Sequence, residues 1–408
     1  MPPPPPDSTA SVVALSLPLA PPAERAKPDM RLLVLLALGH CVIDANQGAM
    51  PAMLPFLKAA LGLSYAATGV VVLTANVTSS LIQPAFGYLA DQTSRRWLLP
   101  VSVLCTAVGF GLTGLAGSYA GVLALIAIMG IGAASYHPEG YRTATAVAGA
   151  RKATGVSVFS TGGNIGIAIG PFLITLLVTT FGPAGSVFMM LPGLLVAALF
   201  VVALPRLSVP PPVRTTGATA DGRGETMVAA MALLVGVVAV RSWTQLGFTT
   251  FVPFYYLDVL RGDPRLLGAL LSVFYGAGAV GTLVMGPIAD RVGPRRYVVS
   301  VFLLATPVAI GVPFASAPVL FVLLAALGFI MVSTFAVSVV LAQAYLPRHP
   351  GMASGLVVGF ATGAGGLGAS TLGLVADHWG VATALGISAV MPILGFGVAL
   401  FLPEPRSR

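Results

Sequence analysis

Apolar stretches with few or no charges alternate with short charged segments along this chain. Six stretches are each long enough for one membrane crossing of about 20 residues. They are 31–57, 59–90, 226–257, 266–289, 350–376 and 379–403. Three longer stretches, 97–136, 153–205 and 297–347, contain turn signals at Gly117-Ser118, Gly182-Pro183 and Ser316-Ala317-Pro318. We therefore predict twelve transmembrane helices and an all-α membrane protein.

Composition supports this interpretation and excludes a soluble protein. Of the 408 residues, 56% are hydrophobic and only 8% are charged, far from the usage of soluble domains. Neither Cys41 nor Cys105 belongs to a CxxC pattern, so we predict no disulfide framework and no metal site. We also expect no bound cofactor, because the chain has no GxxxxGK[ST] loop and its three GxGxxG matches lie inside apolar stretches.

The distribution of Lys and Arg predicts the orientation, because loops on the cytoplasmic side carry an excess of both. With a cytoplasmic N-terminus, most of the 21 basic residues fall on that side, whereas Lys58, Arg261 and Arg265 fall outside. We therefore predict a multi-pass protein of the inner (plasma) membrane with both termini in the cytoplasm. The isoelectric point near 9.8 then reflects topology, and we predict no nucleic-acid partner.

Two halves of the sequence repeat at an offset of about 200 residues. The segment "GYLADQTSRR" (87–96) matches "GPIADRVGPRR" (286–296). These loops pair Gly87 with Gly286, Asp91 with Asp290, and Arg95 and Arg96 with Arg295 and Arg296. We predict a disordered tail at 1–30, a six-helix bundle at 31–205, a cytoplasmic linker at 206–226, a second bundle at 227–403 and a tail at 404–408.

The repeated loops are candidates for a gate. An aspartate and two arginines at a span end can form ion pairs that close one conformation and open in another. The alternative is that the arginines only anchor the loop in the cytoplasm.

Two glycine runs predict close helix packing. Gly162, Gly166 and Gly170, followed by Pro171, and separately Gly355, Gly359 and Gly363 recur every four residues, so each run lies on one helix face. The alternative is the general abundance of glycine in membrane helices.

Ionisable side chains at membrane depth are the strongest candidates for function, because each is costly there unless it is paired or hydrated. They are His40, Asp44, His137, Glu139, Arg142 and Arg241, and the polar Gln47 and Gln245 lie near them. His40 and Asp44, four apart, share a helix face, as do Glu139 and Arg142, three apart. A kink at Pro138 would turn His137 and Glu139 toward one cavity.

In one interpretation Asp44 or Glu139 carries a proton and the arginines bind an anion. In the other, Glu139 pairs permanently with Arg142, and His137 bonds to a backbone carbonyl.

The paired loops and "GGNIGIAIGP" in the fifth span resemble the major facilitator superfamily of secondary transporters. Within it, "GHCVIDANQ" (39–47), "YHPEGYR" (136–142), "GGNIG" (162–166) and "GMASGL" (351–356) are similar to the fosmidomycin-resistance branch.

The resemblance implies alternating access between two six-helix bundles and export of a small polar or anionic compound, such as a phosphonate, in exchange for protons. A proton-coupled importer of an organic acid or sugar and a non-transporting receptor remain as alternatives. We predict a monomer, with protons, a small-molecule substrate and the lipid bilayer as partners, and no enzymatic activity.

Overall fold

Helices are the regular elements of the computed structural model, which describes residues 28–92, 95–207 and 227–405. The side chains of residues 90–92, 350, 351, 360 and 362 are outside this description. Of the predicted tails and linker, residues 1–27, 208–226 and 406–408 also lie outside it.

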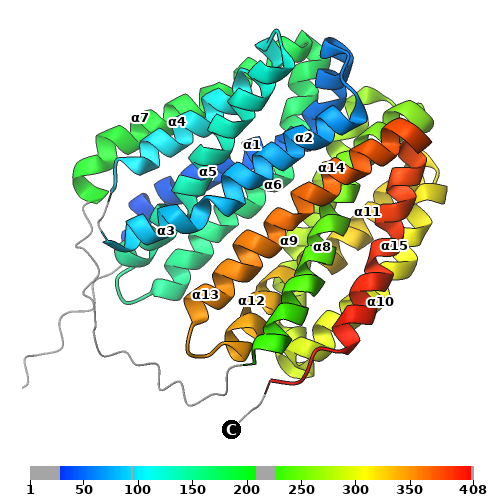
Figure 1. The fold of residues 1–408 in the computed structure, drawn as a ribbon. Helices are drawn as coiled ribbons and strands as arrows, with labels where there is room; N and C mark the ends of the chain where they lie inside the picture. Colours follow the sequence, from blue (N-terminus) through cyan, green and yellow to red (C-terminus); the bar gives the residue numbers. More distant parts are fainter. Residues whose placement is uncertain (1–27, 93–94, 208–226, 406–408) are drawn as a thin grey trace, which may run out of the picture.

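Seven α-helices build the N-terminal half: α1 (Met30–Leu61), α2 (Tyr65–Asn76), α3 (Gln83–Gln92), α4 (Leu98–Gly111), α5 (Tyr119–Val147), α6 (Lys152–Phe181) and α7 (Met190–Ala203). Eight build the C-terminal half: α8 (Val228–Phe254), α9 (Leu267–Val292), α10 (Pro294–Gly311), α11 (Ala317–Val332), α12 (Thr334–Tyr345), α13 (Pro350–Gly355), α14 (Thr362–Trp379) and α15 (Val381–Leu400). Figure 1 shows the two halves side by side, with the N-terminal half in blue to green.

Twelve helical segments of the described chain are long and apolar enough to cross a membrane, which confirms the predicted number. Several span the junction of two helices, as Tyr65–Leu89 does across α2 and α3. The turn signals inside the long apolar stretches mark real chain reversals. Ser118, for example, caps α5 by accepting a hydrogen bond from the backbone N–H of Gly121 at 3.2 Å, and Gly182 ends α6 with a φ of 70° that favours glycine.

The repeat in the sequence appears in the packing of the two halves. In the N-terminal half α1 packs along α6 and α4 along α7. Their counterparts in the C-terminal half, α8 with α14 and α10 with α15, also pack together. Across the interface α2 packs on α14 and α6 on α9, which are again equivalent pairs under the 200-residue offset. The same fold therefore occurs twice.

The halves pack closely at the end where α1 leads into α2, which we call the distal end. A Cβ on Gly373 of α14 would lie 2.6 Å from the carbonyl oxygen of Tyr65, and one on Gly268 of α9 would lie 2.3 Å from that of Pro171. Neither distance leaves room for a side chain. Glycine is therefore required for this close approach.

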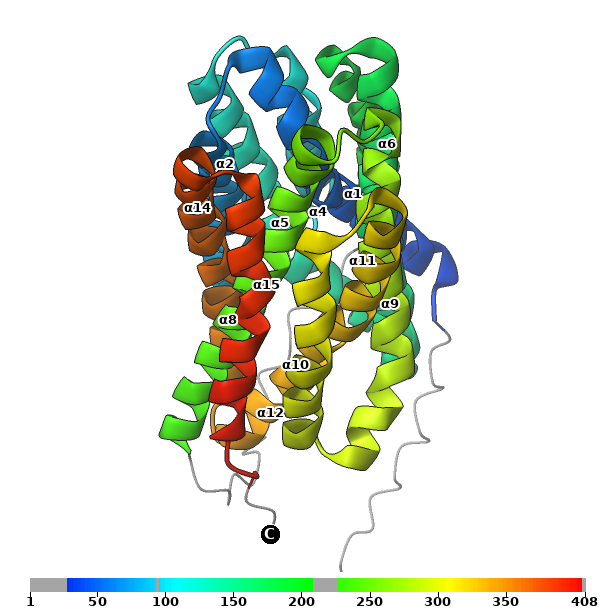
Figure 2. The ribbon, with the colours of Figure 1, turned by 90° about the vertical axis from the view of Figure 1, so that its right-hand side faces the viewer.

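The opposite end, where the first half stops at Leu207 and α8 begins, we call the linker end. Here a pocket of about 460 Å³ opens between the halves, lined by Gln83, Gly87 and Tyr88 on one side and by Ser354, Gly355 and Val358 on the other. Figure 1 shows α3 and α13 apart at this end, and Figures 1 and 2 both show α2 and α14 running together toward the distal end. The structure is therefore closed distally and open at the linker end.

The α2 and α14 spans each contain a π-helical turn, Val77–Leu81 and Leu356–Ala361, and these turns contact each other. Widened turns of this kind often mark functional positions in helices.

Candidate functional site

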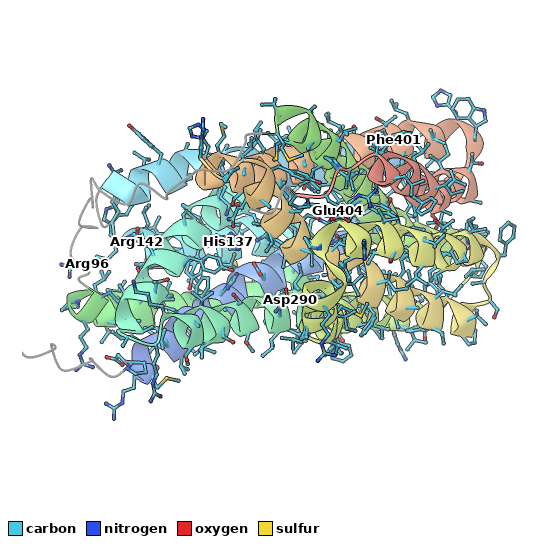
Figure 3. All side chains as sticks on the ribbon, turned by 90° about the horizontal axis from the view of Figure 1, so that it is seen from below. Arg96, His137, Arg142, Asp290, Phe401 and Glu404 are labelled. Carbon is cyan, nitrogen blue, oxygen red and sulfur yellow. The ribbon has the colours of Figure 1, made fainter. Side chains whose placement is uncertain are left out.

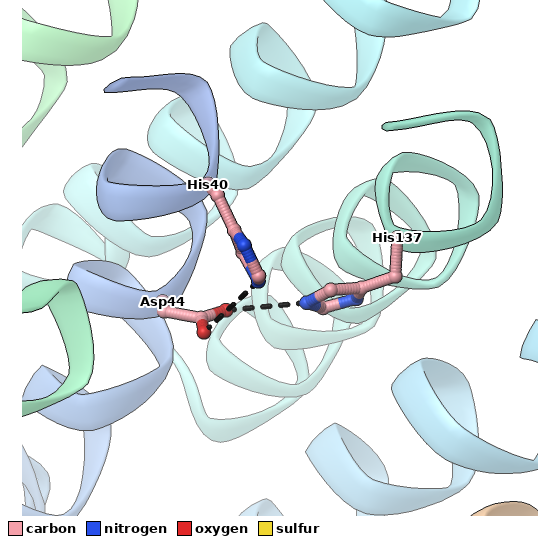
Figure 4. Close-up of side chains that lie close together, drawn as sticks. All are labelled: His40, Asp44 and His137. Carbon is pink, nitrogen blue, oxygen red and sulfur yellow. Dashed lines mark hydrogen bonds and ion pairs between the residues drawn. The ribbon is translucent and has the colours of Figure 1, made fainter. Parts of the chain in front are cut away.

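Two histidines flank the carboxylate of Asp44 inside the N-terminal half (Figure 4). His40 Nε2 lies 3.3 Å from Oδ2 of Asp44, and His137 Nε2 lies 3.2 Å from Oδ1. Gln47 donates a hydrogen bond from Nε2 to the same Oδ1 at 3.3 Å. The predicted pairing along α1 is thus joined by His137 from α5. We call His40, Asp44 and His137 the histidine–aspartate cluster.

The contacts of His40 determine how many protons the cluster holds. Its Nδ1 lies 2.9 Å from the carbonyl oxygen of Phe159, and a carbonyl can only accept, so Nδ1 carries a proton. In a neutral imidazole Nε2 would then present a lone pair to the Asp44 carboxylate, which is repulsive. The contact is favourable only if an additional proton lies on His40 Nε2 or on Asp44. This arrangement is therefore favourable when the cluster holds one proton beyond those of two neutral histidines and a carboxylate.

Gly163 of α6 leaves space for this cluster, and the sequence analysis did not identify it. A Cβ at this position would lie 2.6 Å from both Asp44 Oδ2 and His40 Nε2. His40 also stacks on the Phe159 ring, with centroids 4.2 Å apart. The "GGNIG" motif was the available signal, but the residue spacing does not distinguish Gly163 from its neighbours.

Glu139 lies apart from the cluster, although α5 continues through Pro138. Its side chain is fully buried, and its two oxygens accept hydrogen bonds from Arg142 Nη2 at 2.6 Å and Nε at 3.3 Å. The prediction that a kink turns His137 and Glu139 toward one cavity is wrong, because the helix remains continuous and the two side chains leave it in different directions. His137 bonds to Asp44 instead of the backbone carbonyl named in the alternative.

Arg241 lies at a cavity of about 270 Å³ between the two halves. Its side chain is buried and donates from Nη1 to Oε1 of Gln245 at 3.0 Å. The guanidinium carbon lies 5.6 Å from the centre of the Phe335 ring. Among the described residues no carboxylate lies within 4.0 Å of Arg241, and its Nε has no hydrogen-bond partner. A buried guanidinium without a counter-charge favours an anion beside it.

Both halves contribute polar side chains to this cavity. Asn76 of α2 and Asn164 of α6 come from the N-terminal half, and Ser242, Gln245 and Thr282 come from the C-terminal half. Of these, the sequence analysis identified Gln245 alone. Asn164 follows Gly163, so one turn of α6 touches the histidine–aspartate cluster and lines the cavity.

Within the described chain, the cluster is also the one group of three side chains whose donor atoms could surround a metal ion, since one atom from each lies within 4.8 Å of the others. Imidazole and carboxylate ligands suit Zn²⁺. We assign no metal here, because a single proton accounts for the contacts of His40.

One arginine of each repeated loop binds the last helix of its own half. Arg96 donates to the carbonyl oxygen of Leu204 at 2.8 Å, after α7. Arg295 donates to the carbonyl oxygens of Leu400, at 3.1 Å, and Leu402, after α15. Arginine at a helix C-terminus satisfies carbonyls that have no partner within the helix. Each contact connects neighbouring helices within one half, although Arg96 and Arg295 are not partners under the 200-residue offset.

Other members of the loops make no such contact in this conformation. Asp290 is exposed and forms no ion pair or hydrogen bond with the described residues, and Gly286 has open space around it. Arg295 and Arg296 each lie 3.6 Å from Glu404. Figure 3 shows Asp290 and Glu404 in the C-terminal half, and Arg96, His137 and Arg142 in the N-terminal half. Arg95 is half-buried, Gly87 borders the linker-end pocket, and the side chain of Asp91 lies outside the description. A gate formed by these loops stays a prediction.

The two glycine runs differ. A Cβ on Gly162, Gly166 or Gly170 would lie 2.0–2.2 Å from a carbonyl oxygen of α1, so α6 lies against α1 along the whole run up to Pro171. By contrast, a Cβ on Gly355 or Gly363 would meet nothing within 4 Å, and one on Gly359 would make ordinary contact with Ser80 and Pro84. In this conformation α14 packs closely through Gly365, Gly366, Gly368 and Gly373 instead.

A polar clamp, which the sequence analysis did not predict, joins the halves at the distal end. Asp377 of α14 accepts hydrogen bonds from the backbone N–H groups of Tyr65 and Ala66 at 2.8 and 2.9 Å. The Tyr65 hydroxyl donates to Asp258 at 2.7 Å, and the Lys58 ammonium lies 4.3 Å from the centre of the Tyr65 ring. We call Lys58, Tyr65, Asp258 and Asp377 the distal clamp.

Two similar helical bundles with a polar cavity at their interface are the arrangement found in many secondary transporters. The model of the Major Facilitator Superfamily matches residues 36–262 and 231–408. The chain belongs to this superfamily and is a secondary transporter, not an enzyme.

Relatives cover nearly the whole chain. It is 32% identical over 391 residues to the fosmidomycin resistance protein of Escherichia coli (strain K12), covering 94% of this chain and 95% of that protein. It is 31% identical to the MFS-type transporter YfnC of Bacillus subtilis (strain 168), covering 92% and 93%. The multidrug resistance protein MdtG of Serratia proteamaculans (strain 568) is 26% identical over 61% of each chain.

Solved structures share the fold at low identity. A bacterial homologue of the human lysosomal transporter Spinster, in an inward-facing and unoccupied conformation, matches with a TM-score of 0.74 at 15% identity, covering 92% of this chain and 98% of that one. A point mutant of the nucleoside transporter NupG matches with a TM-score of 0.75 at 13% identity, covering 92% and 99%.

Proposed function

We propose that this transporter exports a small polar or anionic compound, such as a fosmidomycin-like phosphonate, in exchange for protons. The relatives named for fosmidomycin and multidrug resistance support export. The distribution of basic residues supports a plasma-membrane protein with both termini and the linker end in the cytoplasm. The conformation described above then faces inward, where an exporter collects its substrate. We propose that it works as a monomer.

The contacts of His40 with both Asp44 and the Phe159 carbonyl are the observation that carries this proposal. His40 needs a proton on Nε2, or on Asp44, to lie 3.3 Å from that carboxylate while its Nδ1 bonds to Phe159. Histidine is the side chain whose charge changes most readily near neutral pH. Asp44 and His137 are partly exposed, so a proton can reach the cluster from the space beside it. Asp44 is therefore the proposed carrier, with His40 and His137 as its partners.

Glu139 is the weaker of the two predicted carriers. It is fully buried and holds Arg142 through both oxygens, and a buried ion pair is costly to separate. We propose that this pair stays closed during transport and supports α5 beside the cluster.

Arg241 is the proposed anion ligand. A guanidinium can bind a phosphonate or carboxylate through two parallel hydrogen bonds, and Arg241 has no acidic partner within the described chain. Arg142 is engaged by Glu139, so we do not assign it to the substrate. Asn76 and Asn164 reach the same cavity from the other half, which would allow one substrate to contact both halves.

Transport by inverted membrane vesicles tests the direction and the coupling together. With an acidic lumen, we expect labelled fosmidomycin to enter the vesicles while the lumen becomes more alkaline. The Asp44→Asn variant should lose both changes but still exchange labelled for unlabelled substrate across the membrane. If preloaded substrate instead leaves together with protons, the protein is an importer. Binding without any accumulation in the wild type would indicate a receptor.

A further inference from the structure

Three adjacent pockets follow α6. A pocket of about 350 Å³ lies between α1 and α6 and ends at Ile165. A second, of about 500 Å³, begins at Ile165, lies between α6 and α9, and ends at Phe172. A third, also of about 500 Å³, begins at Phe172 and ends beside Arg265. Neighbouring pockets share Ile165 or Phe172 as a lining residue, and we call the three together the α6 groove.

The middle of the groove has the surface of a lipid contact. Its lining is apolar except for Ser272, and comes from Ile165, Ala168, Ile169 and Phe172 of α6 and from Ala269, Ser272 and Val273 of α9. Ile165 and Phe172 are 54% and 48% exposed. In a protein with twelve membrane spans, apolar side chains this exposed on the outer surface face hydrocarbon.

The distal end of the groove has a free positive charge. Arg265 is exposed, and its guanidinium makes no hydrogen bond or ion pair with any described residue. The neighbouring acid, Asp263, accepts a hydrogen bond at 2.9 Å from the backbone N–H of Arg265 and so caps the turn that precedes α9. The side chain of Arg265 is left to bind a group from outside the chain.

The dimensions fit one leaflet. Between Ile165 and Thr180, both of which line the groove, α6 rises by about 22 Å at 1.5 Å per residue. Half of a hydrocarbon core is about 15 Å thick, and the headgroup region adds several ångströms. An acyl chain that fills the middle pocket therefore places its phosphate near Arg265.

We propose that the α6 groove binds an anionic phospholipid of the distal leaflet, with the phosphate at Arg265 and one acyl chain between α6 and α9. Charge complementarity selects an anionic lipid over a zwitterionic one. The acyl chain would cross the seam between the halves, where Gly268 of α9 meets the backbone of Pro171 and Phe172. Such a lipid contacts both halves while the distal end is closed, and therefore stabilises the inward-facing conformation.

Photolabelling of the full-length protein in nanodiscs tests the site. The probes are phosphatidylglycerol and phosphatidylcholine, each with a photoreactive group on one acyl chain, and labelled peptides are identified by mass spectrometry. We expect phosphatidylglycerol to label the segments 165–172 and 269–273 about fivefold more than phosphatidylcholine, the factor that corresponds to roughly 1 kcal/mol for one cation at an anionic surface.

Two arginine variants decide whether Arg265 selects the lipid. Arg265→Gln should reduce labelling by phosphatidylglycerol to the level of phosphatidylcholine. Arg261→Gln removes the same charge from the same loop but does not border the groove, so it should keep the preference. Equal labelling by both probes in the wild type, or the same loss in both variants, would overturn the proposal. Because no substrate takes part, the outcome is independent of the proposed transport activity.

Discussion

Asp377, near the end of α14, caps the first residue of α2, Tyr65, from the opposite half of the molecule: its Oδ1 accepts a hydrogen bond from the Tyr65 backbone N–H at 2.8 Å, although 312 residues separate the two. The N-terminus of a helix has N–H groups without partners inside the helix, and a carboxylate there is also favoured by the helix dipole. This bond cannot survive separation of the halves at the distal end. The distal clamp therefore opposes any conformation that is open at the distal end.

Removing this cap should shift the equilibrium toward the conformation that is open at the distal end. Loss of a capping side chain costs about 1 kcal/mol, so we expect Asp377→Ala to increase the population of that conformation about fivefold. Spin labels at Gly117→Cys and Ser316→Cys, in the distal loops of opposite halves, with Cys41 and Cys105 replaced, would report this as longer distances.

Ser64→Ala is a matched control for the clamp. Ser64 caps the same helix, accepting a hydrogen bond from the Ala67 N–H at 3.1 Å, but belongs to the N-terminal half. Its loss should weaken α2 without separating the halves. Equal distance changes in both variants would mean that helix stability, rather than the contact between halves, controls the distances.

Breaking the Glu139–Arg142 pair should lower the stability of the fold more than it affects the coupling of transport to protons. Glu139→Gln leaves the Arg142 charge poorly compensated in a buried site, and we expect a loss of about 3 kcal/mol, measured as a lower midpoint of thermal unfolding in detergent. The double variant Glu139→Gln with Arg142→Gln should recover part of this loss. If Glu139→Gln folds normally but abolishes acid-driven uptake, then Glu139 carries the proton and our assignment to Asp44 is wrong.

Substitution of Gly163 should disrupt the cluster specifically. The added Cβ of Gly163→Ala meets the side chains of Asp44 and His40. Because these side chains can shift, we expect the variant to fold but to transport at a rate at least tenfold lower when driven by acid. Gly162→Ala places a Cβ 2.1 Å from the backbone of Ala37, which cannot move without separating α1 from α6, so it should mainly lower the unfolding temperature. Normal coupling in Gly163→Ala would show that the observed geometry is not needed for coupling.

Arg241→Lys should weaken the binding of anions. Lysine keeps the charge but loses the planar pair of donors, and we expect about a tenfold higher Kd for fosmidomycin from ligand-dependent thermal stabilisation. Arg142→Lys is the matched control and should leave this Kd unchanged, because Arg142 is engaged by Glu139. A Kd that rises only in Arg142→Lys would show that the substrate binds at the linker end of α5 instead.

Local pattern was enough to predict the twelve spans, the turns within the long apolar stretches and the list of ionisable residues at membrane depth. The thickness of the bilayer sets the length of each apolar run. Polar side chains inside these runs are easy to recognise because each is costly there. The pairing of His40 with Asp44 and of Glu139 with Arg142 also follows from helical spacing alone.

Contacts between distant segments required the tertiary structure. His137 reaches Asp44 from another helix, Gly163 makes room for both His40 and Asp44 from a third, and Asn76 joins Arg241 at the cavity from the other half. Asp377 and Asp258 are isolated acids in the sequence, and nothing local indicates that they hold Tyr65. Residue spacing reports which face of a helix a side chain occupies, whereas the packing of helices decides what that face meets.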